Sequence, residues 1–77
     1  MRVDKQKIDE AVLGLLYLTL HEDGSAWKGF DFETMNRLHE KGLIGNPVNK
    51  NKSVVLTDKG IAESRRLFEL LFMKAQE

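Results

Sequence analysis

The apolar positions in the first third of the chain repeat with the period of an α-helix. From Lys5 to about Glu22 apolar residues recur three and four positions apart, and no strong helix breaker intervenes. Asp4 is a suitable N-cap for this helix, and Gly24 is suited to its end. Asp9 and Glu10 lie in the N-terminal half, where the helix dipole favours acidic side chains.

A second helix is predicted from about Phe32 to Lys41. Asp31 fits its N-cap, and Gly42 fits the left-handed position that follows many helices. Hydrophobic contacts are expected at both ends of this helix, from Phe30 to Met35 and from Leu43 to Leu38. We assign its inner face to Phe32, Met35 and Leu38.

The remainder of the chain predicts a hairpin followed by a third helix. Leu43 and Ile44 precede a turn at residues 45–47, a polar tip follows at residues 49–52, and a β-branched run occupies residues 53–57. Thr57 is a suitable N-cap for a helix that runs to about Ala75. The short segment from Ser25 to Lys28 is a candidate third strand beside the hairpin.

This order of elements predicts a mainly α (α+β) fold: three helices with a small β-hairpin wing, in one domain over residues 1–77. The sequence from Arg37 to Ile44, the basic-tipped hairpin and the Val54 to Gly60 segment together resemble the second half of a winged helix-turn-helix domain. In such domains the helix before the hairpin usually reads DNA, and the hairpin is the wing.

A narrower resemblance rests on the motif Ala-Trp-Lys-Gly-Phe-Asp at residues 26–31, with matching segments at 42–44, 46–47 and 52–57. On these motifs the chain resembles a family of small uncharacterised bacterial proteins, a domain of unknown function, over roughly residues 5 to 72. The resemblance implies a fold and no activity. One departure from a winged helix-turn-helix is that only Gly24 to Phe30 stands where a separate positioning helix belongs, and seven residues form at most one helical turn.

Composition narrows the class of protein. With 42% hydrophobic and 31% charged residues the chain is typical of a soluble globular domain, and we expect it to be cytoplasmic and not membrane-bound. Twelve basic residues balance twelve acidic ones, so the net charge favours no polyanionic partner. A chain of 77 residues has a small core, and the absence of cysteine excludes disulfides and thiolate metal sites. We therefore expect a partner subunit to supply additional stability.

Candidate nucleic-acid contacts lie in the second helix and the hairpin. No acidic residue occurs between Lys41 and Thr57, so the hairpin is locally positive, as phosphate contact by a wing requires. A soluble turn of Asn and Lys explains the same composition, and acidic residues of the second helix would repel phosphates. The candidate residues are Lys28, Arg37, Lys41, Lys50 and Lys52.

Other chemistry is weakly represented. Trp27 and Phe30 are either anchors of the core, which we favour, or an aromatic platform for a base or a proline-rich peptide. His21 and His39 have no metal-ligand spacing. The sequence contains no phosphate-binding glycine loop, cysteine nucleophile or nucleophile-elbow serine, so we expect no enzymatic activity, no catalytic residue, no metal and no cofactor.

The first helix is apolar on two sides. Ile8, Ala11, Val12, Leu15, Leu16 and Thr19 form one stripe, and Leu13, Tyr17 and Leu20 form another. Either both stripes are sandwiched within one chain, with Gly14 at a close helix crossing, or one stripe meets a second chain. We predict a homodimer, and its candidate interface residues are Leu13, Tyr17, Leu20, Leu70 and Met73.

The sequence thus predicts a non-enzymatic binding module, with DNA as the first candidate partner on the analogy of the fold. The alternative is a protein-interaction adaptor in which the winged fold does not bind nucleic acid. Acidity of the second helix and the missing positioning helix favour the adaptor, whereas the acid-free hairpin favours DNA.

Overall fold

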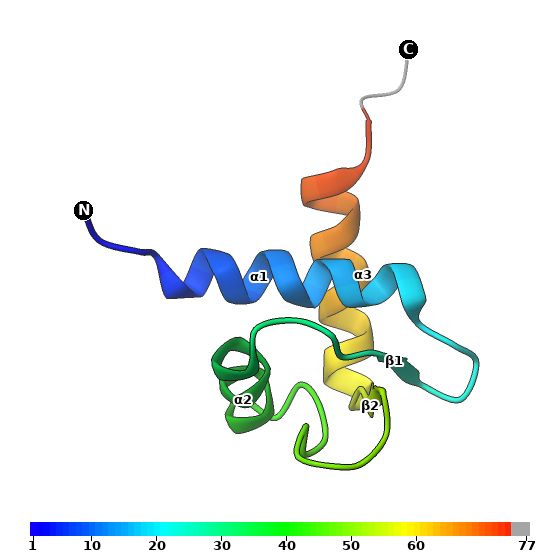
Figure 1. Cartoon of the computed structure of the whole chain (residues 1–77). Coiled ribbons are helices and arrows are strands. Elements are labelled where there is room, and N and C mark those ends of the chain that lie inside the picture. The colour runs from blue at the N-terminus through cyan, green and yellow to red at the C-terminus, as the bar shows by residue number, and fades with distance from the viewer. Residues whose placement is uncertain (75–77) are drawn as a thin grey trace.

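The computed structural model describes residues 1–74, in which two helices cross and a third helix packs with a small sheet on one side of the crossing (Figure 1). The elements in chain order are α1 (Lys5–Leu16), a 3₁₀ turn (Tyr17–Thr19), β1 (Ser25–Trp27), α2 (Phe32–Glu40), β2 (Ser53–Val55) and α3 (Asp58–Phe72). The predicted layout of three helices with a small antiparallel sheet, similar to a winged helix, is confirmed.

All three helices begin at the predicted N-caps. The side chain of Asp4 accepts a hydrogen bond from the Lys7 backbone N–H, and that of Asp31 accepts one from the Thr34 N–H, both at 3.1 Å. Thr57 caps α3 in the same way, because its hydroxyl oxygen accepts from the backbone N–H of Gly60 at 3.0 Å. Each bond satisfies an amide that has no partner within its helix.

The C-terminal end of α2 is also where the sequence predicts it. Gly42 has a φ of 75°, a conformation that strains residues with a side chain. The Gly42 N–H bonds to the His39 carbonyl and the Leu43 N–H to the Leu38 carbonyl, each at 3.0 Å. These two bonds are those of a Schellman motif. They turn the chain back so that Leu43 joins Leu38 in the core.

The predicted end of the first helix near Glu22 is wrong. After Leu16 the chain tightens into a 3₁₀ turn, and Leu20 is already extended. Polar groups of the residues that follow bind β1: Thr19 Oγ1 accepts from the Trp27 N–H at 3.0 Å, and the His21 N–H, which a longer helix would use, donates to the Ser25 carbonyl at 2.8 Å. At the other end of the chain α3 ends at Phe72, and its predicted end near Ala75 lies outside the described residues.

The sheet joins segments from both sides of α2. β1 pairs antiparallel with β2, with Ala26 opposite Val54. The predicted hairpin is closed by one bridge, between Ile44 and Leu56, and its polar tip forms a wing loop (residues 45–52). The segment at residues 25–28 therefore does add a strand beside the hairpin, and this strand makes most of the pairing.

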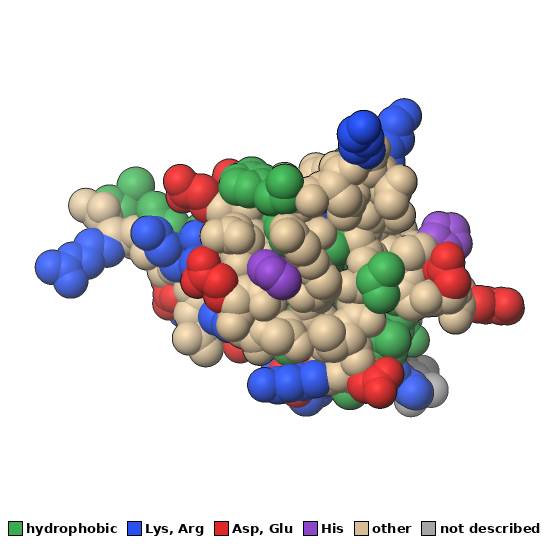
Figure 2. All heavy atoms as spheres, turned by 90° about the horizontal axis from the view of Figure 1, so that it is seen from below, with side chains coloured by type: hydrophobic (Ala, Val, Ile, Leu, Met, Phe, Trp, Pro, Cys, Tyr) green, Lys and Arg blue, Asp and Glu red, His purple; other side chains and the backbone are tan. Residues whose placement is uncertain are grey.

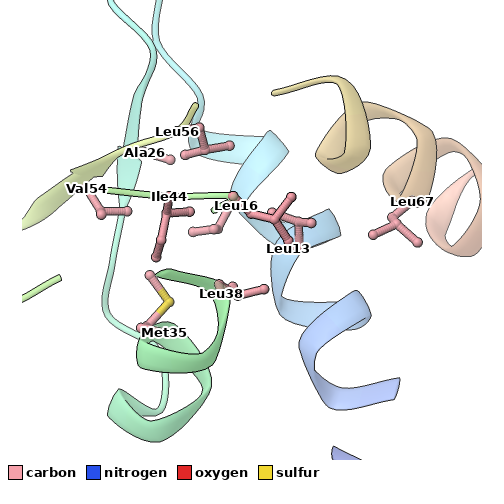
Figure 3. Close-up of a cluster of buried hydrophobic side chains, with 10 residues drawn as sticks. Leu13, Leu16, Ala26, Met35, Leu38, Ile44, Val54, Leu56 and Leu67 are labelled. Carbon is pink, nitrogen blue, oxygen red and sulfur yellow. The ribbon is translucent and has the colours of Figure 1, made fainter. Parts of the chain in front are cut away.

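The core lies between α1, α2 and the sheet (Figure 3). Leu13 and Leu16 of α1 are almost fully buried and face Leu38 of α2 and Leu67 of α3. Gly14 lies at a close crossing with α3, since a Cβ there would lie 3.3 Å from the backbone nitrogen of Phe68. At Leu13, α1 is therefore packed between other helices of the same chain, which is the first of the two arrangements that the sequence allowed.

This burial corrects part of the predicted dimer interface. Leu13 is 2% exposed and is not available to a partner chain. Leu20 packs partly buried against the core, and the ring of Tyr17 lies 5.3 Å from that of Phe68. The predicted inner face of α2 also needs correction, because Phe32 is 58% exposed while Met35 and Leu38 are buried.

Candidate functional site

The five predicted nucleic-acid residues surround α2 and the wing loop, but three of them are occupied by contacts within the chain. Arg37 and Lys41 come from α2 and its C-cap, Lys28 follows β1, and Lys50 and Lys52 lie in the wing loop. Their local geometry decides which are available to a ligand.

Arg37 and Lys41 both bind one buried carboxylate, that of Asp9 on α1. The Asp9 side chain is only 3% exposed. Its oxygens lie 2.8 Å from Nη2 of Arg37 and 2.8 Å from Nζ of Lys41. Arg37 Nε also donates to Asp9 at 2.9 Å, and Arg37 Nη2 donates to the Thr34 hydroxyl at 3.1 Å. The three side chains form an ion triad that ties α1 to α2.

Electrostatics at Asp9 favours its charged form. Burial alone raises the pKa of the Asp9 carboxyl, but hydrogen bonds and charges from Arg37 and Lys41 outweigh burial and hold the pKa below its ordinary value of 3.8. The carboxylate is therefore ionised at neutral pH, and the two cations that surround it are neutralised in part. A buried carboxylate with two cationic partners is a structural tie, because removal of the carboxylate leaves both cations without the charge that compensates them.

Sequence reasoning missed this role of Asp9. The acid was attributed to the helix dipole, whereas it lies on the same side of α1 as Leu13 and Leu16, four and seven positions later. An acidic residue in line with a buried apolar stripe is the signal that indicates a buried, paired carboxylate.

Lys28 is held in the wing loop. Its Nζ donates to the Pro47 carbonyl at 2.8 Å, to the Asn49 carbonyl at 3.0 Å and to Asn49 Oδ1 at 2.7 Å. Three acceptors satisfy all three donors of the ammonium group. Lys28 therefore shapes the loop and has no free donor for a phosphate.

The outward side of α2 is acidic and apolar. Asp31, Glu33, Glu40 and Phe32 are all exposed, and Asn36 donates to Glu40 at 3.0 Å. On the underside of the molecule, over α2 and the wing loop, acidic, basic and apolar side chains are interspersed (Figure 2). Such a surface would present carboxylates to the phosphates of a duplex if α2 entered a groove.

Lys50 and Lys52 remain available. Both are exposed in the wing loop, and within residues 1–74 neither takes part in an ion pair. The two lysines of the wing are thus the part of the predicted basic surface that a phosphate can reach.

Trp27 is not the core anchor that we favoured from the sequence. It is 50% exposed, on the outer side of β1, while its neighbour Ala26 is fully buried. Its ring lies 5.7 Å from that of Phe30 in an edge-to-face arrangement, and Phe30 is the member of the pair that packs against the core.

A pocket of about 370 Å³ opens between the three helices. Leu13, Leu38, Leu43 and Leu67 line it, and charged side chains of both signs surround them. Asp9 and Lys41 on its lining already bind each other. Glu10 and Lys59 also line the pocket, and within residues 1–74 neither takes part in an ion pair. Within residues 1–74 no three His, Asp or Glu side chains are grouped so that they could hold a metal ion.

Exposed apolar side chains surround the end of α3. This terminal patch (Leu70, Leu71, Phe72 and Met73) is exposed, with Leu70 at 68% and Met73 at 61%. The last turns of α3 extend beyond α1 (Figure 1), and of the four residues Phe72 still lies against Gly14 of α1. Two predicted interface residues, Leu70 and Met73, are accessible, in contrast to Leu13.

Among the described residues no helix has both the length and the apolar character needed to cross a membrane.

The chain matches one protein family and is similar to a protein of known sequence. The family described as Domain of unknown function (DUF6429) matches residues 4–74. The Uncharacterized protein y4hR of Sinorhizobium fredii (strain NBRC 101917 / NGR234) is 60% identical over 74 residues, which cover 96% of this chain and all of that protein. No solved structure matches the chain.

Proposed function

We propose a function for a chain that belongs to the DUF6429 family: it is a non-enzymatic bacterial module that binds protein, first of all a second copy of itself, through the end of α3. This is the adaptor alternative of the sequence analysis. The homodimer and the absence of catalysis are both parts of the proposal.

The observation that carries the proposal is the terminal patch. Gly60, Ser64 and Leu67 form the buried side of α3. Leu71 follows Leu67 by one helical turn on the same side, yet Leu71 is 48% exposed whereas Leu67 is 3% exposed. Four consecutive exposed apolar residues at the end of a helix are typical of an association surface.

The small size of the domain supports the same conclusion. A chain of 77 residues without cysteine has a limited core, and a second subunit is a common supplement. Two-fold association would bury the terminal patch of both chains at once, because the same surface serves on each side of such an interface.

We expect the protein to have twice the chain mass in solution and the double substitution of Leu70→Glu with Met73→Glu to halve it. Two buried carboxylates in each chain would oppose association, while both positions are exposed in the single chain, so the fold should persist. Light scattering measures the mass, and circular dichroism checks the fold.

Val48→Glu is the matched control. Val48 is 66% exposed, like Leu70, but lies in the wing loop away from the terminal patch. This variant should keep the mass of the dimer. A wild-type protein that is monomeric at high micromolar concentration would contradict the homodimer.

DNA binding is the second candidate function, and Lys50 with Lys52 favours it. The ion triad, the satisfied ammonium of Lys28 and the acidic outer side of α2 weigh against a helix that reads duplex DNA. We therefore propose that any contact with duplex DNA is confined to the wing loop.

We expect the affinity for mixed-sequence duplex DNA to fall with salt with a log–log slope of no more than about 2. Each phosphate contact contributes about 0.9 to this slope, and Lys50 and Lys52 are each free to make one such contact. Lys50→Ala with Lys52→Ala should remove the dependence. Fluorescence anisotropy across a salt series measures it. A slope of about 5 or more would mean that α2 also contacts phosphates, and DNA binding would then be the favoured function.

A further inference from the structure

Residues 26–31 hold one aromatic ring at the surface. Ala26 is buried in the core, Phe30 packs against the core, and Asp31 caps α2. Three positions of the motif therefore anchor the segment, and they leave Trp27 half exposed between them. The exposed ring is the feature of this motif that packing of the single chain does not explain.

The ring of Trp27 is held in position from below and from the side. It lies over the backbone of Gly29, where a Cβ would come within 2.1 Å of the indole carbon Cζ2. The Phe30 N–H bonds to the Lys28 carbonyl at 2.7 Å and tightens the turn beneath the ring. Phe30 meets the ring edge-to-face at 5.7 Å. A residue with a side chain at position 29 would displace the indole, so the turn is fitted to a surface tryptophan.

The wing loop is joined to the end of β1 that carries this ring. Trp27 is paired with Ser53 across the sheet, and the next residue of the loop, Lys52, accepts a backbone hydrogen bond from Lys28 at 3.0 Å. The Lys28 ammonium fixes the loop further along, at Pro47 and Asn49. The wing loop that carries Lys50 and Lys52 is thereby held against the end of β1.

The wing loop itself carries cations and no acid. No acidic residue occurs between Lys41 and Thr57, and both wing lysines lack ion-pair partners within residues 1–74. A fixed aromatic ring next to a loop that carries free cations is a combination by which proteins bind single strands, with a base stacked on the ring and phosphates on the cations. A proline-rich peptide would use the ring but not the lysines.

We propose that Trp27, Lys50 and Lys52 form a binding site for single-stranded nucleic acid, with a base stacked on the exposed indole. The site lies on the sheet and the wing loop, apart from the terminal patch of α3, and it goes beyond the proposed protein-binding function. In a duplex the bases are stacked on one another, so the ring has no base to stack on until a strand is free.

The single tryptophan of the chain makes the site directly observable. We expect titration of the full-length protein with an oligothymidylate of about ten nucleotides to quench Trp27 fluorescence, because a base stacks on the fluorophore. A matched duplex should quench it little. An oligouridylate of the same length distinguishes RNA from DNA, and both results support a single-strand site.

Variants separate stacking from charge. Both tryptophan variants lack the fluorophore, so anisotropy of a labelled oligonucleotide follows their binding. Trp27→Ala should weaken binding by about 5- to 100-fold, as expected for one stacked base, and Trp27→Phe should retain most of the affinity. Lys50→Ala with Lys52→Ala should lower the salt slope by about 1.4, or about 0.7 for each contact with a single strand. Lys59→Ala, an exposed lysine at the start of α3, is the matched control and should leave the slope unchanged.

The proposal is overturned if neither oligonucleotide quenches the fluorescence, or if a proline-rich peptide quenches it and the oligonucleotides do not. It is also overturned if the double lysine variant, which retains the ring, binds with an unchanged salt slope. None of these outcomes depends on the mass of the protein in solution, so this test and the test of the homodimer fail separately.

Discussion

Gly60→Ala is expected to destabilise the protein by about 3 kcal/mol or more, a large share of the roughly 4–11 kcal/mol typical of a domain of this length. A Cβ at Gly60 would lie 1.8 Å from the carbonyl oxygen of Leu43 and 2.8 Å from its carbonyl carbon. Overpacking against flexible side chains usually costs about 1–3 kcal/mol, and here the obstacle is backbone.

The Leu43 carbonyl is not free to move aside. It accepts the Thr57 N–H at 3.0 Å and the Thr57 hydroxyl at 3.1 Å, so its displacement would also break the cap of α3. Leu43 is in addition the residue that closes α2. The added methyl group would therefore push apart the C-terminal end of α2 and the N-terminal end of α3, which are both hydrogen-bonded to Leu43.

Thermal unfolding followed by circular dichroism measures this effect. For a domain of 60–100 residues, 3 kcal/mol corresponds to a fall in Tm of about 12–24 °C. Gly45→Ala is the matched control, since the nearest atom to its Cβ is a carbonyl oxygen at the ordinary distance of 3.5 Å. A Gly60→Ala variant within 1 kcal/mol of the wild type would mean that α3 and Leu43 are not in contact as described.

Asp9→Asn is expected to lower stability at neutral pH by about 2–4 kcal/mol. The substitution keeps the shape of a side chain that is 3% exposed but removes the charge that compensates Arg37 and Lys41. The value lies below that of a fully buried pair, because the side chains of Arg37 and Lys41 are 24% and 44% exposed and water screens part of their charge.

The pH dependence has a defined sign. The pKa of Asp9 in the folded protein lies below its ordinary value of 3.8, so the unfolded chain takes up the proton more readily. The contribution of Asp9 is fully present above the ordinary pKa and is lost as pH falls through the lower pKa of the folded state. The stability difference between wild type and Asp9→Asn should thus be constant from about pH 5 to 7 and shrink below about pH 4.

Urea unfolding at several pH values measures the difference. Glu63→Gln is the matched control, because Glu63 pairs with Arg66 at 2.9 Å on the exposed side of α3 and such pairs contribute about 0–1 kcal/mol. If Asp9→Asn and Glu63→Gln have equal effects at pH 7, the triad is not a buried tie, and Arg37 and Lys41 are available to a ligand.

The sequence does not decide whether a residue is buried or exposed when its type is common in both environments. Trp27 and Phe30 are equally apolar, and their spacing alone does not say which one faces the core. The structure divides them, because Trp27 projects from the outer side of β1 whereas Phe30 follows the turn at Gly29 and packs against the core. The alternation of a strand of three residues is too short a pattern to reveal this.

The first helix shows the same limit for association. Apolar residues on both of its sides left open which side meets the rest of the chain and which side is free. Leu13 is buried, and the accessible members of the predicted interface, Leu70 and Met73, lie on α3. Only the crossing of α1 and α3 at Gly14 decides this, since it determines how far each helix extends uncovered.

The sequence by itself determined the three N-caps at Asp4, Asp31 and Thr57 and the end of α2 at Gly42. Each of these depends on hydrogen bonds or backbone angles within a few residues, so the determinants are adjacent in the chain. The tertiary structure alone decided the partners of Asp9. These are Arg37 and Lys41, which lie 28 and 32 positions later in the chain. It also decided the early end of α1, where Thr19 binds β1. Helical periodicity places a side chain on a face, but which charge or strand meets that face is settled only when distant segments pack.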